Sequence, residues 1–578
     1  MPSRTGTAHV VTTSRTYKGT TYRTHLLRRS YRENGKVKNE TLGNLSHLPE
    51  PLIEIVRRSL QGETFIPLGQ AFEVVASRPH GHVHAVEVAV QRLGLAALLA
   101  ATPSRERERV LAMVAARIVA PSPKLATTRW RHTTTLASEF GVLDTDEDDL
   151  YAAMDWLLVR QDAIQKKLAA RHLSEGGLVL YDLSSSYFEG TTCPLAKLGH
   201  NRDGKKGLLQ VNYGLLTDAR GCPVAVSVHE GNVADSATFL PEVQRLRERF
   251  GIEQLVMVGD RGMISNKAID ALRELDGVGW ITALKSASIR TLVEQGQLQL
   301  GLFDERNLVE ISAPQYPGER LVACRNPQLA KLRALKREEL LVATEKSLQQ
   351  IKERVDAGRL KKADAIGLAA GKVVNRYKVA KHFELAIGEN RFTFARKREA
   401  IAAEAALDGI YIIRTSVVAA RMEAAECVRN YKALANVERA FRSLKTVDLK
   451  VRPIHHRTAD RVRAHILLCM LAYYVEWHMR EAWRELMFAD TDQTAKATRD
   501  PVALAQRSQA ALDKLASRKV DDGSPAHSFA TLMAELGTIV RNTCRTPSAG
   551  PEAPTFDIVT TPNATQRHAL DLIKQIRP

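Results

Sequence analysis

Three carboxylates stand where their chemistry would be unusual for a purely structural role. Asp182 lies in an apolar run at 177–183, Asp260 follows a second run at 255–258, and Glu438 lies in a segment with helical periodicity. A carboxylate next to a buried strand is costly unless it is paired, hydrogen-bonded or metal-bound. Although each acid alone is more often a turn or a cap, together they predict a metal site. Two Mg²⁺ ions about 4 Å apart, or Mn²⁺ in their place, would suit phosphoryl transfer.

The spacing around Glu438 adds phosphate-binding groups. Tyr431, Glu438 and Lys445 are seven residues apart, which is nearly two helical turns with a drift of about 20° per step. A continuous helix over 424–445 would align the phenol, the carboxylate and the ammonium, so that Tyr431 and Lys445 hold phosphates beside a metal ligand. Arg439 and Arg442 flank Glu438 as further DNA contacts. An ordinary amphipathic helix that packs on a core is an equally open interpretation.

The composition indicates a polyanionic partner. The chain has 578 residues, 44% of them apolar, and a formal net charge of +18, which excludes disordered and collagen-like chains. Residues 1–60 hold eleven Lys or Arg against four Asp or Glu, and residues 426–463 hold ten against four. Such clusters fit a grip on a phosphate backbone, with nucleic acid as the first expectation and an acidic membrane surface as the second.

A β-hairpin is predicted near the start of the chain. Alternating apolar and polar residues at 22–42 surround an Asn34-Gly35 turn, which is a strong hairpin signal. The hairpin carries Arg28, Arg29 and Arg32. We expect either a ribbon that touches DNA or a solvated edge ribbon.

The cysteines and the hydropathy predict a cytoplasmic protein. Six cysteines lie far apart without a C-x-x-C pair, which argues against a disulfide framework or a thiolate zinc site. The longest apolar run, residues 466–475, is about half a membrane span. We therefore expect no membrane association.

The elements that must position the acids form an α/β layer. Strands are predicted at 177–183, 211–216 and 224–228, followed by a helix at 236–250, a strand at 255–258, a helix at 266–275 and a strand at 280–284. Three sequential strands followed by alternating helices and strands indicate a mixed sheet with flanking helices. The 178 residues between Asp260 and Glu438 are too many for a loop and predict an inserted domain.

These motifs resemble a known family. Tyr431, Glu438 and Lys445, in Y-x6-E-x6-K, resemble the Y-x2-R-x3-E-x6-K signature of bacterial insertion-sequence DDE transposases, the insertion-sequence 4 family and its relatives. Residues 181–190 (YDLSSSYFEG) are similar to the first-Asp motif, residues 258–262 (VGDRG) to the second, and residues 229–232 (HEGN) to the loop between them. The chain departs from the signature at Leu434, where the family carries Arg, so one phosphate contact is missing unless Arg439 or Arg442 replaces it.

The resemblance implies a ribonuclease-H-like mixed sheet with flanking helices, interrupted by a large inserted domain and preceded by an N-terminal DNA-binding region. It also implies metal-dependent cleavage at the terminal inverted repeats and strand transfer into target DNA, by a homodimer assembled on DNA. A structure-selective nuclease of the same fold and an inactive DNA-binding derivative are the alternatives. The predicted division is a basic ribbon (1–75), a helical DNA-binding region (76–172), the first part of the core (173–299), the inserted domain (300–405), the second part of the core with the Glu438 helix (406–490) and a C-terminal tail for dimer or target contacts (491–578).

Overall fold

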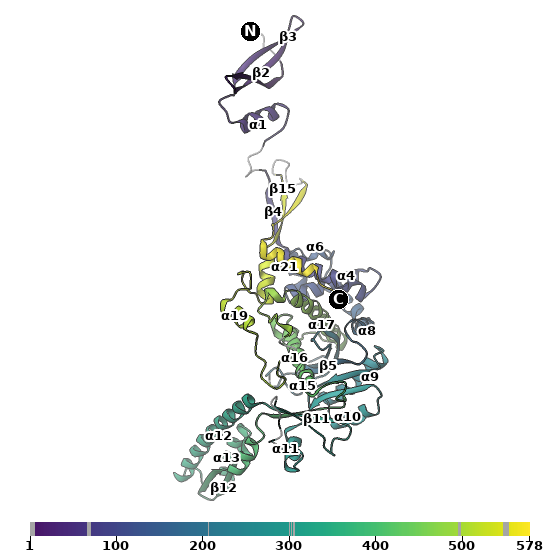
Figure 1. Ribbon diagram of the computed structural model, residues 1–578, viewed down its shortest axis with the longest axis vertical. Helices are drawn as coiled ribbons and strands as arrows, with labels where there is room; N and C mark the ends of the chain where they lie inside the picture. Colours follow the sequence, from purple (N-terminus) through teal and green to yellow (C-terminus); the bar gives the residue numbers. More distant parts are fainter. Residues whose placement is uncertain are drawn as a thin grey trace. The chain divides into compact units, whose positions relative to one another are not determined.

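The computed structural model describes residues 6–65, 71–205, 207–299, 301, 303, 307–494, 499–546 and 554–577 (Figure 1). The chain divides into two compact units. The smaller unit comprises Met1–Ser77 and Arg541–Thr560, and the larger comprises Arg78–Val540 and Thr561–Pro578.

The smaller unit contains two three-stranded sheets. One sheet has the order β1 (Ala8–Tyr17), β2 (Thr20–Glu33) and β3 (Lys36–Asn44), and α1 (Glu50–Leu60) follows it. The β2–β3 turn has positive φ at both Asn34 and Gly35, as a two-residue hairpin requires, so the predicted hairpin is confirmed. The other sheet joins β4 (Glu73–Pro79) to β15 (Val540–Arg545) and β16 (Thr555–Val559), which brings the two ends of the chain together.

The larger unit contains an eight-stranded mixed sheet with the order β10-β11-β14-β9-β8-β5-β6-β7. Its strands are β5 (Gly177–Tyr187), β6 (Gln210–Thr217), β7 (Pro223–Glu230), β8 (Leu255–Val258), β9 (Val278–Ala283), β10 (Leu308–Ile311), β11 (Arg320–Arg325) and β14 (Ile410–Thr415). β5, β6 and β7 form an antiparallel meander, and β8 and β9 continue from β5 in parallel. This topology confirms the mixed sheet that was predicted.

Both faces of this sheet carry helices. The Tyr181 ring on β5 contacts Phe239 of α9 (Asp235–Glu248), with ring centroids 6.5 Å apart. The Tyr213 ring on β6 contacts Phe441 of α16 (Leu434–Arg442) at 5.7 Å. Further helices at the sheet are α10 (Asn266–Arg273), α11 (Ser286–Glu294), α15 (Ala424–Lys432) and α17 (Ala459–Ala482).

A helical layer packs against α17 and the β7 side of the sheet. It comprises α2 (Gly81–Arg92), α3 (Leu95–Leu99), α4 (Arg105–Val119), α5 (Lys124–Trp130), η2 (Arg131–Thr133), α6 (Leu136–Glu139), α7 (Glu147–Val159) and α8 (Gln161–His172). From the C-terminal segment come η5 (Arg484–Leu486), α19 (Gln509–Ser517), α20 (Phe529–Gly537) and α21 (Ala564–Lys574). Because α20 and α21 pack on α2, the segments predicted as a helical region and a tail share one hydrophobic core.

In the described part of the chain, no single helix is long and apolar enough to cross a membrane. Arg105–Val119 and Lys124–Thr133 pass that test of length and composition as a pair, but a bend of 87° separates them. All six cysteines are free and buried.

The insertion lies between two neighbouring strands of the sheet, β11 and β14. It contains α12 (Pro327–Asp356), α13 (Ala363–Arg376), η3 (Ala380–His382), the hairpin β12 (Phe383–Gly388) and β13 (Arg391–Arg396), and α14 (Arg398–Ala405). Its own core includes Leu341, Ile366 and Phe392. The insertion was predicted to start at residue 300, but β10 and β11 extend the main sheet, so the separate core begins only with α12.

A buried polar cluster fixes the segment that follows α16. Glu476 of α17 is fully buried, and its Oε1 accepts hydrogen bonds from Ser443 Oγ at 3.0 Å and Arg480 Nε at 2.6 Å. Arg480 also pairs with Asp448 at 2.8 Å. Glu476 Oε2 has no hydrogen-bond partner among the described residues. Burial is the main reason that the pKa of Glu476 is raised from 4.5 to about 7.

This raised pKa predicts a pH-dependent stability. The folded state holds the proton up to about pH 7 while the unfolded state loses it near pH 4.5, so this group's contribution to stability falls as the pH rises between these values. We expect Glu476→Gln to match the wild type below pH 4.5 and to exceed it above pH 7, by up to about 3 kcal/mol. Urea unfolding across this range would measure the difference.

Glu481→Gln is the matched control, because Glu481 is exposed on the same helix and pairs with Arg484. It should change stability little at any pH. An equal loss of stability for Glu476→Gln above pH 7 and below pH 4.5 would show that Glu476 is ionised throughout.

Candidate active site

The sheet register brings the first two predicted acids together. β5 and β8 run parallel, and Leu180 lies beside Val258. Asp182 and Asp260 each come two residues later. Asp260 follows the end of β8, and Asp182 lies level with it within β5, the neighbouring strand about 4.8 Å away. The edge where parallel strands end is where α/β sheets place ligands. The register therefore makes neighbours of two acids that are 78 positions apart.

Strand alternation directs Asp182 toward the helix that carries Glu438. Successive side chains point to opposite faces, so Asp182 shares a face with Ser186, whose Oγ lies 2.9 Å from Tyr213 Oη. Tyr213 in turn contacts Phe441 of α16. α16 packs on β5 through Val437, Ala440 and Phe441, while Glu438 is exposed. Glu438 is thus presented beside the sheet edge rather than buried in it.

The charges of the three acids act on one another and on Tyr431 across a common space. Burial, and to a smaller extent the charges of Asp260 and Glu438, raise the pKa of Asp182 to about 7, against the lowering effects of Arg202 and of the Leu183 N–H. The pKa of Tyr431 is raised to about 12, mainly by burial, and Asp260, Glu438 and Asp182 all raise it further. Tyr431 therefore shares this space with all three carboxylates.

The donor set fits divalent cations. Three carboxylates that repel one another, one of them with a raised pKa, need positive charge, and their oxygens are the ligands that hard cations prefer. Among the described residues, the three acids do not form a group whose oxygens all lie within 4.8 Å. Oxygens that all lie within 4.8 Å of one another would suit one shared ion. Two ions about 4 Å apart, each with its own outer acid, allow a wider spread.

The predicted continuous helix over 424–445 is wrong, because it is divided into three pieces. α15 ends at Lys432, α16 begins at Leu434, and a π-helical turn, η4 (Ser443–Val447), follows Arg442. The seven-residue spacing from Glu438 to Lys445 therefore does not keep Lys445 on the line predicted for an α-helix. Lys445 Nζ instead lies 3.0 Å from the carboxylate of Asp203, and burial lowers the pKa of Lys445.

The arginines of α16 and the leucine that departs from the signature lie on different sides of the helix. Arg439 and Arg442 are exposed, like Glu438. Arg439 Nη1 donates a hydrogen bond to Asn436 Oδ1 at 3.3 Å. Leu434 is half-buried and packs on the core. Leu434 thus serves packing, and the exposed arginines are the cations available next to Glu438.

Sequence reasoning missed two arginines near the acids. Arg202 follows β5 in a polar loop, lies close enough to lower the pKa of Asp182, and pairs with Asp235 at 2.5 Å. Arg261 directly follows Asp260, is exposed, and lowers the pKa of Tyr431. Arg261 could have been found from its place in the VGDRG motif. Arg202 carries no local signal, because only the fold brings its loop to Asp182.

In the smaller unit, the three predicted arginines do not share one face. Alternation along β2 places Arg28 and Arg32 on one face and Arg29 on the other. Arg29 stands opposite Glu40 of β3, whereas Arg28 and Arg32 stand opposite Thr41 and Val37. The face with Arg28 and Arg32 is therefore the one whose charge is not offset by a cross-strand acid.

Comparisons with known proteins agree with this geometry. The family described as "Transposase DDE domain" matches residues 182–475, just over half of the chain, and this range contains Asp182, Asp260 and Glu438. The family described as "IS1634 family transposase, N-terminal domain" matches residues 10–65. No curated protein matches the chain.

A solved structure of a piggyBac transposase synaptic complex with hairpin DNA is also similar, at 8% identity and a TM-score of 0.35, over 86% of this chain and 83% of that one. The family match over the acids and the match over the N-terminal residues decide the assignment. The chain belongs to the DDE transposases and is an insertion-sequence transposase that binds DNA and acts in DNA transposition.

Proposed function

We propose that this transposase cuts the terminal inverted repeats of its element and joins the freed ends to target DNA, with Asp182, Asp260 and Glu438 as the ligands of two Mg²⁺ ions. When bound, these ions would activate the attacking oxygen and stabilise the leaving oxygen. The observation that supports the proposal is the sheet register, which sets Asp182 on β5 level with Asp260 after β8, with the helix that carries Glu438 packed on β5.

The chain's own residues would hold the scissile phosphate in line with its attacker. Arg202 and Arg261 flank the acids, and Tyr431 presents a protonated phenol, because its pKa is raised to about 12. Hydrolysis would leave a 3′ hydroxyl and a 5′ phosphate at the element's end. The 3′ hydroxyl would then attack a target phosphodiester, forming one phosphodiester bond for each one broken. No covalent enzyme intermediate is needed.

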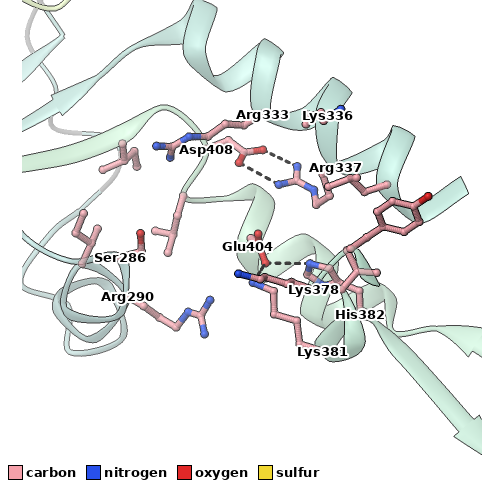
Figure 2. A pocket seen from close by; sticks show the side chains of 16 residues that line it. Ser286, Arg290, Arg333, Lys336, Arg337, Lys378, Lys381, His382, Glu404 and Asp408 are labelled. Atoms are coloured by element: carbon pink, nitrogen blue, oxygen red, sulfur yellow. Dashed lines mark hydrogen bonds and ion pairs between the residues drawn. The ribbon is translucent and has the colours of Figure 1, made fainter. Parts of the chain in front are cut away.

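A basic pocket between α11 and the insertion would hold the DNA backbone. Its volume is about 410 Å³. Figure 2 shows Arg290 of α11, Arg333 of α12 and Lys378 among the side chains that line it. Two ion pairs line the same cavity, Arg337 with Asp408 and Lys381 with Glu404. The excess of cations suits a phosphate of the transposon end, because phosphate contacts dominate DNA affinity.

The metal requirement tests this function. A duplex carrying the element's end should be nicked in the presence of Mg²⁺ or Mn²⁺ and should remain intact with a chelator. Strand transfer should follow when target DNA is added. Nicking without any divalent cation would refute the proposed site, and nicking without strand transfer would favour the structure-selective nuclease. An inactive DNA-binding derivative would do neither.

The β2 arginines predict a change in the salt dependence of DNA binding. Each phosphate contact contributes about 0.9 to the slope of log K against log salt. Arg28→Gln/Arg32→Gln should therefore lower the slope by about 2, measured by fluorescence anisotropy with end DNA. Arg29→Gln is the matched control, because Arg29 faces Glu40 on the other side, and it should leave the slope nearly unchanged. If Arg29→Gln lowered the salt slope by as much per arginine as Arg28→Gln/Arg32→Gln does, DNA would contact both faces of the sheet.

The transposase is expected to act as a homodimer on DNA, because two element ends must be joined in concert. The size of the complex with paired end DNA, measured by light scattering, would test this. A complex with one chain per two ends would contradict it.

A further inference from the structure

Three metal-ligating side chains that play no part in the carboxylate site meet inside the larger unit. His172 is the last residue of α8, Cys222 lies in the turn before β7, and His478 lies near the end of α17. One ligand atom of each lies within 4.8 Å of those of the other two. We propose that His172, Cys222 and His478 form a second metal site, and that it takes Zn²⁺.

The distances suit a tetrahedral ion. Cys222 Sγ and His478 Nε2 are 3.8 Å apart. Zn–S bonds of about 2.3 Å and Zn–N bonds of about 2.0–2.1 Å at a tetrahedral angle require roughly 3.6 Å between these atoms. The pair is thus within a few tenths of an ångström of the required spacing. Cys222 is fully buried and His478 is 7% exposed, so the surrounding core limits how far either can move.

The two histidines are in the protonation state that a metal ligand needs, whereas the cysteine must first lose its proton. Burial lowers the pKa of His478 to about 3 and lowers that of His172, so both imidazoles are neutral, as ligation requires. Burial raises the pKa of Cys222, so the thiol must release its proton to solvent when the Zn–S bond forms. Affinity should therefore increase with pH. The charged groups whose fields reach the three ligands are Asp218, Glu481, Arg171 and Arg220.

The neighbouring groups define the rest of the coordination. Asp218 Oδ1 accepts hydrogen bonds from the backbone N–H groups of Arg220 and Cys222, and Asp218 Oδ2 accepts one from Arg220 Nε. Both oxygens of this carboxylate are therefore already engaged. Water would fill the fourth position, as in zinc sites with three protein ligands. Tyr474 Oη lies 3.1 Å from His172 Nε2 and can fix that ring, as outer partners of metal-bound histidines do.

The ligand types separate this site from the acids. One thiolate and two imidazoles select borderline-soft ions such as Zn²⁺, whereas Mg²⁺ prefers oxygen. The bound ion would join α8, the turn before the edge strand β7, and α17 in one cross-link. This role would be structural, and it does not depend on the metal that supports DNA cleavage.

The test uses the full chain with Asp182→Asn, Asp260→Asn and Glu438→Gln, so that the carboxylate site no longer binds metal. After chelation, the protein is titrated with Co²⁺, whose thiolate bond gives a charge-transfer absorption that oxygen ligands do not produce. We expect one equivalent to bind, Zn²⁺ to displace it, and Zn²⁺ to raise the melting temperature.

Cys222→Ala should abolish the absorption and weaken Zn²⁺ binding by more than about 100-fold, the upper end of the effect of losing an outer partner. Cys469→Ala is the matched control, since Cys469 is also buried and lies 3.9 Å from His465. Cys469→Ala should retain the Co²⁺ charge-transfer absorption and the Zn²⁺ affinity. If Cys222→Ala does not fold, His172→Gln, at a half-buried position, should still weaken binding. The absence of the absorption, or its persistence in Cys222→Ala, would overturn the proposal.

Discussion

Asp182→Asn, Asp260→Asn and Glu438→Gln are each expected to reduce end cleavage by at least about 10³-fold. Each change keeps the side chain's size and removes the charge that would hold a metal ion. A metal ion supplies several kcal/mol of charge stabilisation, and about 4 kcal/mol corresponds to about 10³-fold in rate. Single-turnover cleavage of end DNA at saturating protein would measure the loss without a contribution from binding.

DNA binding should survive in all three variants. The acids repel one another in their common space, and they would also repel phosphates, so removing a charge should leave metal-free affinity unchanged or slightly higher. Glu426→Gln is the matched control for Glu438→Gln, because Glu426 is an exposed acid on α15, the preceding helix. It should cleave at the wild-type rate. Full cleavage by any one of the three variants would remove that residue from the site.

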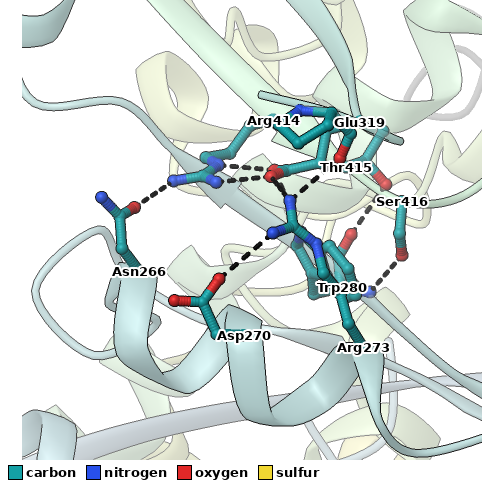
Figure 3. A network of polar contacts seen from close by, with 9 residues as sticks. Asn266, Asp270, Arg273, Trp280, Glu319, Arg414, Thr415 and Ser416 are labelled. Atoms are coloured by element: carbon teal, nitrogen blue, oxygen red, sulfur yellow. Dashed lines mark hydrogen bonds and ion pairs between the residues drawn. The ribbon is translucent and has the colours of Figure 1, made fainter. Parts of the chain in front are cut away.

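Glu319→Gln is expected to destabilise the larger unit by about 3–5 kcal/mol, the usual cost of breaking a buried ion pair. The Glu319 side chain is fully buried and accepts two hydrogen bonds from Arg414 at 2.6 Å each and one from Arg273 at 2.9 Å (Figure 3). Trp280 Nε1 donates a further one at 3.3 Å. Removing the charge leaves Arg414 without the carboxylate it pairs with, whereas Arg273 keeps Asp270 at 3.1 Å.

The loss should also reach the active site. Arg414 Nη1 donates a hydrogen bond at 2.7 Å to Asn266 Oδ1, and Asn266 begins α10 directly after the Asp260 loop. Thermal unfolding should show a fall in melting temperature of about 3–5 °C. In folded protein below that transition, the cleavage rate should fall further than the affinity for DNA, because the anchor of the Asp260 loop is loosened.

Two further variants make the Glu319 prediction specific. Glu310→Gln breaks an equally close arginine pair, with Arg320 at 2.7 Å, but Glu310 is exposed, so the cost should be no more than about 1 kcal/mol. Glu319→Leu/Arg414→Met replaces the main ion pair by apolar groups and should recover part of the loss. Equal effects of Glu310→Gln and Glu319→Gln would contradict the importance assigned to burial.

Much of the fold followed from local patterns. The strand predicted at 255–258 coincides with β8, and the Asn34-Gly35 turn has the positive φ values that its residues allow. These elements were predictable because apolar runs and turn residues act over a few positions. The three acids were recognised for the same reason, since each lies in a short motif.

Other features depend on contacts between distant residues. The helix over 424–445 has one continuous periodicity, yet it breaks at Ala433 and passes into a π-helical turn. Ser443 in that turn is held by Glu476 and Asp448, which a window of residues 424–445 cannot reveal. β10 and β11 likewise look like part of the insertion until they pair with β14.

The sequence by itself determined the three acid motifs, the Asn34-Gly35 turn and apolar strands such as 255–258, because these depend on the chemistry of neighbouring residues. Tertiary structure alone decided what those residues meet: Asp203 for Lys445, Glu319 for Arg414, and His172 and Cys222 for His478. The physical reason is that buried charges and soft ligands are assigned to partners by sheet register and helix packing. Those long-range contacts leave no periodic trace along the chain.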